Sequence, residues 1–164
     1  MRYTRQRDSF TCGPVAILNA VRWSGGKARY EDKFDNYVGR CRCVPPWGTK
    51  HGAFDRVLRV EGDGLYKVRR VYRPTIAQIT SHLLNGGAVI LNYRTGKKHK
   101  DPRKERRHFY MLTESSPFGL VFGAVNRNYN TPAFSEISFL DLQEDCKHRR
   151  SDRAFKAWFL TREE

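Results

Sequence analysis

The segment that most constrains the fold is residues 13–24, whose apolar side chains surround nearly the whole circumference of a helix. They are Val15, Ala16, Ile17, Leu18, Ala20, Val21 and Trp23. A helix that is apolar on most sides belongs inside a domain. Residues 11–14, Thr-Cys-Gly-Pro, supply a start signal, with the proline in the first turn, and the glycine pair at 25–26 supplies a stop. The sequence therefore predicts a buried helix near the N-terminus, with a cysteine at its start.

The rest of the chain carries shorter helical and strand patterns. Helical turns are expected at 30–38 and 51–60, then a strand at 65–72 and a helix that begins after Thr75 and ends at Leu84. The later elements are expected as strands at 88–93, 108–113, 120–125 and 154–160 and a short helix at 136–146. Because helices come first and strands later, the expected fold class is α+β with an antiparallel sheet. The length predicts one domain, 1–164.

Composition narrows the class of protein. The chain of 164 residues has no apolar run long enough to span a bilayer and begins with a polar segment rather than a secretory signal. A cytoplasmic protein without membrane insertion is therefore expected, and its four cysteines fit a reducing compartment. Lys and Arg number 31 against 17 Asp and Glu, a net charge of +14. Such a field attracts acidic proteins and nucleic acid.

Cys12 is the first residue for which the sequence predicts a chemical role. At the N-terminus of a helix, the helix dipole and the unpaired N–H groups favour the thiolate, which predicts a sulfur that is nucleophilic near neutral pH. Gln6 lies six residues upstream and can bring its side-chain amide to the same place. That amide and the Cys12 backbone N–H would form an oxyanion hole for acyl transfer.

A thiolate nucleophile needs a base, and His108 is the candidate because it opens an apolar strand and can aim its imidazole into a cleft. A third group should orient that imidazole. Asn126 and Asn128 follow the next strand, across the hairpin from His108, and share one face by strand alternation. Either can bond the ring nitrogen, and Asn126 is preferred because it is the first polar residue after the apolar strand.

These features together resemble the papain-like cysteine peptidases. The resemblance rests on Gln6 placed six residues before the Cys12-Gly-Pro that opens a buried helix, and on the late hairpin that begins with His108. Within that clan the chain is most similar to the compact bacterial peptidases that process bacteriocin leaders after a double glycine. The resemblance covers the order of elements over most of the chain. It implies a papain-like fold, with the helix that carries the cysteine packed on the sheet that carries the histidine.

The resemblance also implies roles for the site residues: Gln6 as the oxyanion donor, Cys12 as the nucleophile and His108 as the base. In the bacteriocin-processing family the third member is an aspartate followed by proline. This sequence has Asn126 followed by Arg127, and Asn126 resembles the asparagine of papain itself. The expected function is cleavage of a peptide or isopeptide bond in a peptide or protein substrate through a Cys-His-Asn triad, without a cofactor.

Other functions fit the same residues. A deamidase, a transglutaminase or an acyltransferase uses the same constellation and differs only in the acceptor. In a different class, the chain would be a non-catalytic basic binding protein for nucleic acid or an acidic protein on the same scaffold. In that case Cys12 is a buried small side chain and His108 a satisfied surface histidine.

A basic loop precedes His108 and should border the cleft. Its basic side chains are Lys97, Lys98, Lys100, Arg103, Lys104, Arg106 and Arg107. One interpretation is a solvated loop without a partner, which is common. The other is a loop that recruits an acidic substrate, an acidic partner or nucleic acid by electrostatic steering.

The remaining cysteines do not predict a metal site. Cys41 and Cys43 would supply four zinc ligands together with Cys146 and His148, and three together with His51. Only one residue separates the paired cysteines, whereas structural zinc sites usually leave two to four. Packed or solvent-facing thiols are therefore the preferred interpretation.

Overall fold

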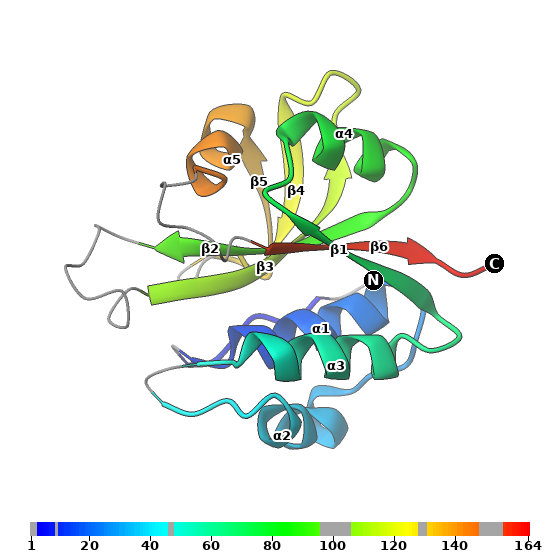
Figure 1. The fold of residues 1–164 in the computed structure, drawn as a ribbon, viewed down its shortest axis with the longest axis vertical. Coiled ribbons are helices and arrows are strands. Elements are labelled where there is room, and N and C mark those ends of the chain that lie inside the picture. Colours follow the sequence, from blue (N-terminus) through cyan, green and yellow to red (C-terminus); the bar gives the residue numbers. More distant parts are fainter. Residues whose placement is uncertain (1–2, 9, 46–47, 96–105, 128–130, 148–155) are drawn as a thin grey trace.

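A buried helix lying against an antiparallel sheet organises the fold (Figure 1). The computed structural model describes residues 3–8, 10–45, 48–95, 106–127, 131–147 and 156–164. The elements, in chain order, are α1 (Cys12–Trp23), α2 (Tyr30–Arg40), α3 (His51–Glu61), β1 (Tyr66–Tyr72), α4 (Ile76–Leu84), β2 (Ala88–Thr95), β3 (Arg106–Ser115), β4 (Val121–Val125), β5 (Phe134–Ser138), α5 (Phe139–Asp145) and β6 (Lys156–Arg162).

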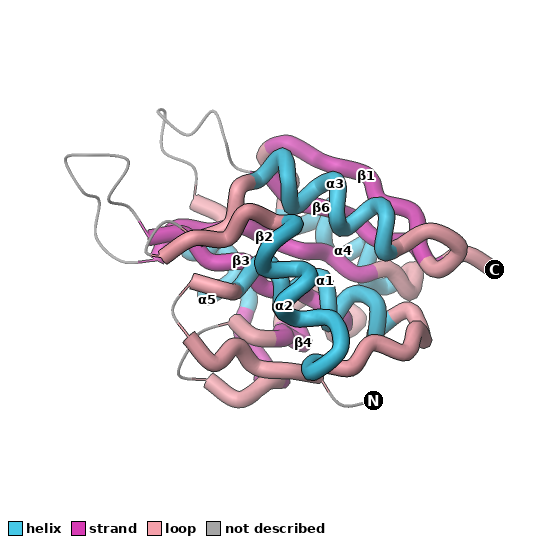
Figure 2. Tube along the Cα trace, turned by 90° about the horizontal axis from the view of Figure 1, so that it is seen from below, coloured by secondary structure: helices cyan, strands magenta, loops and turns pink. Residues whose placement is uncertain are grey.

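The predicted central helix is confirmed by α1, in which every residue except Arg22 is buried. One side of α1 packs on β3, and other sides contact α2 and α3. Figure 2 shows these helices together on one side of the sheet. The amphipathic α2 buries Tyr37 alone, whereas α3 buries Phe54, Val57 and Leu58. The helices outside α1 therefore need only one apolar face, and α1 takes the interior position.

The sheet has the strand order β1-β6-β2-β3-β4-β5, and every neighbouring pair is antiparallel. The last strand of the chain, β6, lies between β1 and β2 and so joins β1 to the rest of the sheet. Helices α1, α2 and α3 cover one face, and α4 and α5 lie on the other (Figure 1). The α+β class with an antiparallel sheet is confirmed.

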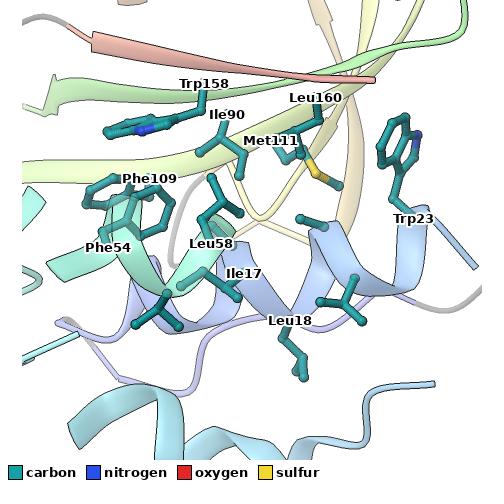
Figure 3. Close-up of a cluster of buried hydrophobic side chains, with 14 of the residues drawn as sticks. Ile17, Leu18, Trp23, Phe54, Leu58, Ile90, Phe109, Met111, Trp158 and Leu160 are labelled. Carbon is teal, nitrogen blue, oxygen red and sulfur yellow. The ribbon is translucent and has the colours of Figure 1, made fainter. Parts of the chain in front are cut away.

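The strands bury both faces by alternation. In β2, Ile90 joins the cluster beneath α1, whereas Val89 and Leu91 join the cluster on the face of α4 and α5. Figure 3 shows the first cluster, in which Phe54 of α3 meets Phe109 and Trp158. The ring centroids of Phe54 lie 4.4 Å from Phe109 and 4.7 Å from Trp158. These large aromatic contacts fasten α3 to β3 and β6 beside the start of α1.

The starts of α4 and α5 differ in how well they agree with the prediction. The cap expected at Thr75 is confirmed, because Thr75 and Gln78 form a reciprocal capping box at the start of α4. The helix expected at 136–146 is wrong in its first residues, since β5 precedes it and α5 begins at Phe139 after its own cap at Ser138. Only Ile137 of β5 is buried, so this edge strand lacks the apolar alternation that would have revealed it.

Candidate active site

Cys12 is the first residue of α1 and is 5% exposed. Its sulfur accepts a hydrogen bond from the backbone N–H of Phe109, the residue that follows His108 in β3. The described pairing of β3 with β4 begins at Met111 opposite Val125, so this N–H lies beyond the end of that ladder. The start of α1 therefore lies against β3, with the Cys12 sulfur beside the residue that follows the histidine.

The electrostatics of Cys12 differ from the expectation of a lowered pKa. Burial raises the pKa of its thiol to about 11, while the backbone N–H groups of Phe109, Gly13 and Cys12 itself act in the opposite direction. The predicted donors are present at the helix start, but desolvation of the thiolate outweighs them. Burial therefore opposes the thiolate that the helix start was expected to favour.

The segment before α3 presses closely on the start of α1. A Cβ at position 13 would overlap the side chain of Thr49, so Gly13 is required by this close approach. Cys43 also lies near the start of α1. Its thiol donates to the carbonyl of Phe10 over 2.9 Å, and a charge on Cys43 would raise the pKa of Cys12. The glycine that follows Cys12 is therefore explained by the close packing of Thr49.

His108 is buried and faces Tyr93, its partner in β2, with ring centroids 5.9 Å apart in an edge-to-face arrangement. Its Nε2 lies 2.6 Å from the backbone carbonyl oxygen of Asn126. Because a carbonyl can only accept, Nε2 carries the proton, and Nδ1 of the neutral ring is left as the basic nitrogen. Burial lowers the pKa of His108, and the hydrogen bond to Asn126 opposes that effect.

Asn126 therefore contacts the imidazole through its main chain, and its side chain has another partner. The Oδ1 atom accepts from the Gln6 backbone N–H over 3.0 Å, and Nδ2 donates to Oε1 of Gln6 over 3.1 Å. The backbone N–H can only donate, which sets the orientation of the Asn126 amide and, through it, that of Gln6. The Gln6 Nε2 group then donates to the Asp8 carbonyl over 2.6 Å. Both amides are buried.

Asp8 is a structural residue of this site to which the sequence analysis assigned no role. Its Oδ1 accepts from the N–H groups of Phe10 and Thr11 over 3.0 and 2.8 Å, and from the Thr11 hydroxyl over 2.7 Å. This carboxylate turn sets the path of the chain between Gln6 and Cys12. The local signal was an aspartate two and three residues before the N–H groups that it binds, a common turn pattern.

The structure thus brings Gln6, Cys12, His108 and Asn126 into one region. Asn128, the alternative third residue, lies outside the described residues, as do five members of the basic loop: Lys97, Lys98, Lys100, Arg103 and Lys104. Arg106 and Arg107 begin β3, opposite Thr95 and Arg94. The electrostatic role of this loop stays a prediction.

The other cysteines occupy the interior. Cys41, Cys43 and Cys146 are buried thiols, and His148 lies outside the described residues. In the described part of the chain, no three His, Cys, Asp or Glu side chains are grouped to hold a metal ion. None of the helices found there has the length and apolar character needed to cross a membrane.

Comparison with solved structures identifies the fold. No protein-family model and no curated sequence matches the chain. The peptidase domain of Streptococcus ComA, a bifunctional ABC transporter involved in quorum sensing, superposes with a TM-score of 0.65 at 14% identity, over 99% of this chain and 100% of that one. A Bacillus anthracis protein described as a C39-like peptidase superposes with a TM-score of 0.68 at 7% identity, over 99% and 96%. The chain therefore has the fold of these peptidase domains, as the resemblance implied.

Proposed function

We propose that the chain is a cysteine peptidase, with Cys12 as the nucleophile and His108 as the general base. The observation that carries this proposal is the hydrogen bond from His108 Nε2 to the Asn126 carbonyl. This hydrogen bond leaves Nδ1 as the proton acceptor. The next residue of β3, Phe109, directs its backbone N–H at the Cys12 sulfur, so the sulfur lies beside the histidine. The fold shared with two peptidase domains supports the same assignment.

The chemistry begins from a neutral pair, because burial raises the pKa of Cys12 and lowers that of His108. Proton transfer from the thiol to Nδ1 therefore accompanies attack of the sulfur on the substrate carbonyl. A C–S bond forms, and the carbonyl oxygen takes up the negative charge. The Asn126 carbonyl, still bonded to Nε2, stabilises the imidazolium that results.

The oxyanion has two candidate donors in this chain. One is the Cys12 backbone N–H at the start of α1, and the other is Gln6 Nε2. That nitrogen has two protons, of which one is given to the Asp8 carbonyl. The second would bind the oxyanion, and the pairing of Gln6 with Asn126 would hold the amide in place.

The cycle ends by acyl transfer. His108 returns its proton to the leaving nitrogen as the C–N bond breaks, which leaves a thioester on Cys12. Water then attacks the thioester with His108 as base, releasing an acid and restoring the thiol. A deamidase would release ammonia from a side-chain amide by the same steps, and a transglutaminase or acyltransferase would replace water by an amine or another acceptor.

The partners and setting are part of the proposal. The net charge of +14 favours an acidic peptide or protein substrate, recruited by electrostatic steering. Nucleic acid is the alternative partner for the same charge, in a protein that binds without catalysis. We also propose a cytoplasmic location, because four free cysteines fit a reducing compartment.

The test is a cleavage assay with a proteome-derived peptide mixture, in which new peptide ends are identified by mass spectrometry. We expect cleavage by the wild type and a loss of at least about a thousandfold in Cys12→Ala and in His108→Ala. Cys41→Ala removes another buried thiol and is the matched control, expected to cleave like the wild type.

The outcomes separate the candidate functions. Cleavage that survives Cys12→Ala would contradict the proposal. Conversion of glutamine to glutamate without new peptide ends would indicate a deamidase. Absence of either reaction, with salt-dependent binding of nucleic acid that survives Cys12→Ser, would favour the binding protein.

A further inference from the structure

The residue whose carbonyl accepts from His108 has a left-handed backbone conformation. Asn126 has a φ of 54°, in a region that few residues with a side chain occupy and that asparagine adopts more readily than most. The residue type permits this conformation, and the contacts on both sides of Asn126 fix the direction of its carbonyl.

On the N-terminal side, the contacts belong to Asn126 itself. Its N–H donates to the Ala133 carbonyl over 2.8 Å, and its side chain pairs with Gln6. These hydrogen bonds hold the backbone N–H and the side chain of Asn126, but they leave rotation about its Cα–C bond open. The carbonyl that faces His108 is part of the peptide unit shared with Arg127, so contacts of Arg127 decide its direction.

Arg127 is held at both its main chain and its side chain. Tyr93 donates its hydroxyl to the Arg127 carbonyl over 3.1 Å, and the Tyr93 ring edge also meets His108. The guanidinium binds Asp145 of α5 in a two-pronged contact, with Nε 3.2 Å from Oδ2 and Nη2 3.4 Å from Oδ1. Tyr110 donates its hydroxyl to the same carboxylate over 2.8 Å.

This arrangement is buried and spans three elements. Asp145 ends α5, Tyr110 lies in β3 two residues after His108, and Arg127 follows β4. The side chain of Asp145 is 7% exposed and that of Arg127 is 24% exposed. A two-pronged contact with a planar guanidinium restricts direction as well as distance.

We propose that the Arg127–Asp145 ion pair is a positioning device that holds the Asn126 carbonyl against Nε2 of His108. This inference rests on the proposed function of His108 as the base. When the pair is broken, the left-handed residue relaxes, the carbonyl turns away, and Nε2 loses its acceptor. The imidazole then samples both neutral tautomers, and Nδ1 is available as a base for only part of the time.

The test is a pH titration of the His108 ring signals by NMR in the full chain, for the wild type and four variants. Arg127→Met removes the guanidinium, and Asp145→Asn keeps the shape of the carboxylate but not its charge. Arg127→Lys keeps a positive charge near Asp145. The matched control is Arg59→Met, because Arg59 makes the same two-pronged contact with Asp55 in α3.

The hydrogen bond to Asn126 raises the pKa of His108, so its loss in a still buried ring lowers the titration midpoint. We expect this downward shift in Arg127→Met and in Asp145→Asn, partial recovery in Arg127→Lys, and no shift in Arg59→Met. The rate of peptide cleavage should fall about tenfold in the first two variants. General loosening of the fold would expose His108 and move its midpoint upward, so an upward shift or no shift overturns the proposal.

One further variant completes the test. Tyr93→Phe keeps the ion pair and removes the hydroxyl bond to Arg127, and it should give a smaller downward shift. If Arg127→Met and Asp145→Asn do not fold, Arg127→Lys decides the question, because it keeps a positive charge but loses the two-pronged contact. A downward shift in Arg127→Lys then supports the proposal, and no shift overturns it. The titration needs no substrate, so failure of the wild type to cleave peptides would overturn the proposed function while leaving this readout intact.

Discussion

Two arginine–aspartate pairs with the same hydrogen-bond pattern lie on opposite faces of the sheet, and only one of them adjoins the candidate active site. In the first, Arg59 binds Asp55 with Nε 3.0 Å from Oδ2 and Nη2 3.3 Å from Oδ1. The indole of Trp158 donates to the same carboxylate over 2.9 Å. Both charged residues belong to α3, four positions apart, so this contact is made within a single helix.

The second pair joins residues that are 18 positions apart and takes Tyr110 as its aromatic donor. The side chains of Asp145 and Arg127 are 7% and 24% exposed, against 19% and 44% for Asp55 and Arg59. Burial raises the pKa of Asp145 even though Arg127 and Tyr110 oppose the shift. At the more exposed Asp55 the hydrogen bonds from Arg59 and Trp158 outweigh burial and lower the pKa.

The comparison shows that an identical contact has different consequences in different surroundings. An ion pair between neighbouring turns on a helix surface adds stability to a helix whose shape does not depend on it. A buried pair between distant segments defines the relative position of those segments, and its loss leaves a charge without a partner inside the protein.

The largest expected difference is in stability. Arg127→Met should lower the free energy of unfolding by about 3 kcal/mol, because it leaves the buried Asp145 carboxylate without its charge partner. Arg59→Met should lower it by less than about 1 kcal/mol, as for other exposed pairs. Urea unfolding followed by circular dichroism measures both, and equal losses would contradict the distinction.

A smaller effect is expected from the aromatic donor. Tyr110→Phe removes one hydrogen bond to Asp145 and leaves the ion pair, so it should cost about 1–2 kcal/mol of unfolding free energy. Combining it with Arg127→Met in a double-mutant cycle should give less than the sum of the two losses, because both act on one carboxylate. Additive losses would show that the two contacts are independent.

The smallest expected effect is the dependence on pH, which should have opposite signs for the two carboxylates. The folded pKa of Asp145 is raised from 3.8, so its contribution to stability is present below that pH and is lost as the pH rises through the folded pKa. The folded pKa of Asp55 is lowered from 3.8, so its contribution is present above that pH and is lost as the pH falls.

Urea unfolding at pH values from about 3 to about 6 brackets the ordinary aspartate range and tests this prediction. The stability of the wild type relative to Asp145→Asn should decrease with rising pH, whereas its stability relative to Asp55→Asn should increase. Slopes of the same sign would refute the assignment of burial as the dominant effect at Asp145.

Much of the fold could be predicted from the sequence, because the signals are local. The apolar circumference of 13–24 predicted the buried helix, and Thr75 predicted the start of α4. The edge strand β5 was missed because it buries only Ile137. With a single buried side chain, the sequence of β5 lacks the apolar alternation that marks a strand.

The candidate site was predictable in its membership but not in its contacts. Cys12 and His108 were selected because a helix start and a strand start are visible in the sequence, and Asn126 because it is the first polar residue after an apolar strand. The role of the Asn126 main chain was not visible, since it depends on a φ of 54°. Neither was the raised pKa of Cys12, because helix-start donors can be read from the sequence and desolvation cannot.

The sequence by itself thus determined the α+β class, the central helix and the residue types gathered at its start. Only the tertiary structure decided that Asn126 presents its carbonyl to His108, that its side chain pairs with Gln6, and that Arg127 reaches Asp145. The physical reason is the range of the interactions. Periodicity and capping act within a few residues, whereas burial and the pairing of polar groups depend on which distant segments the packed core brings together.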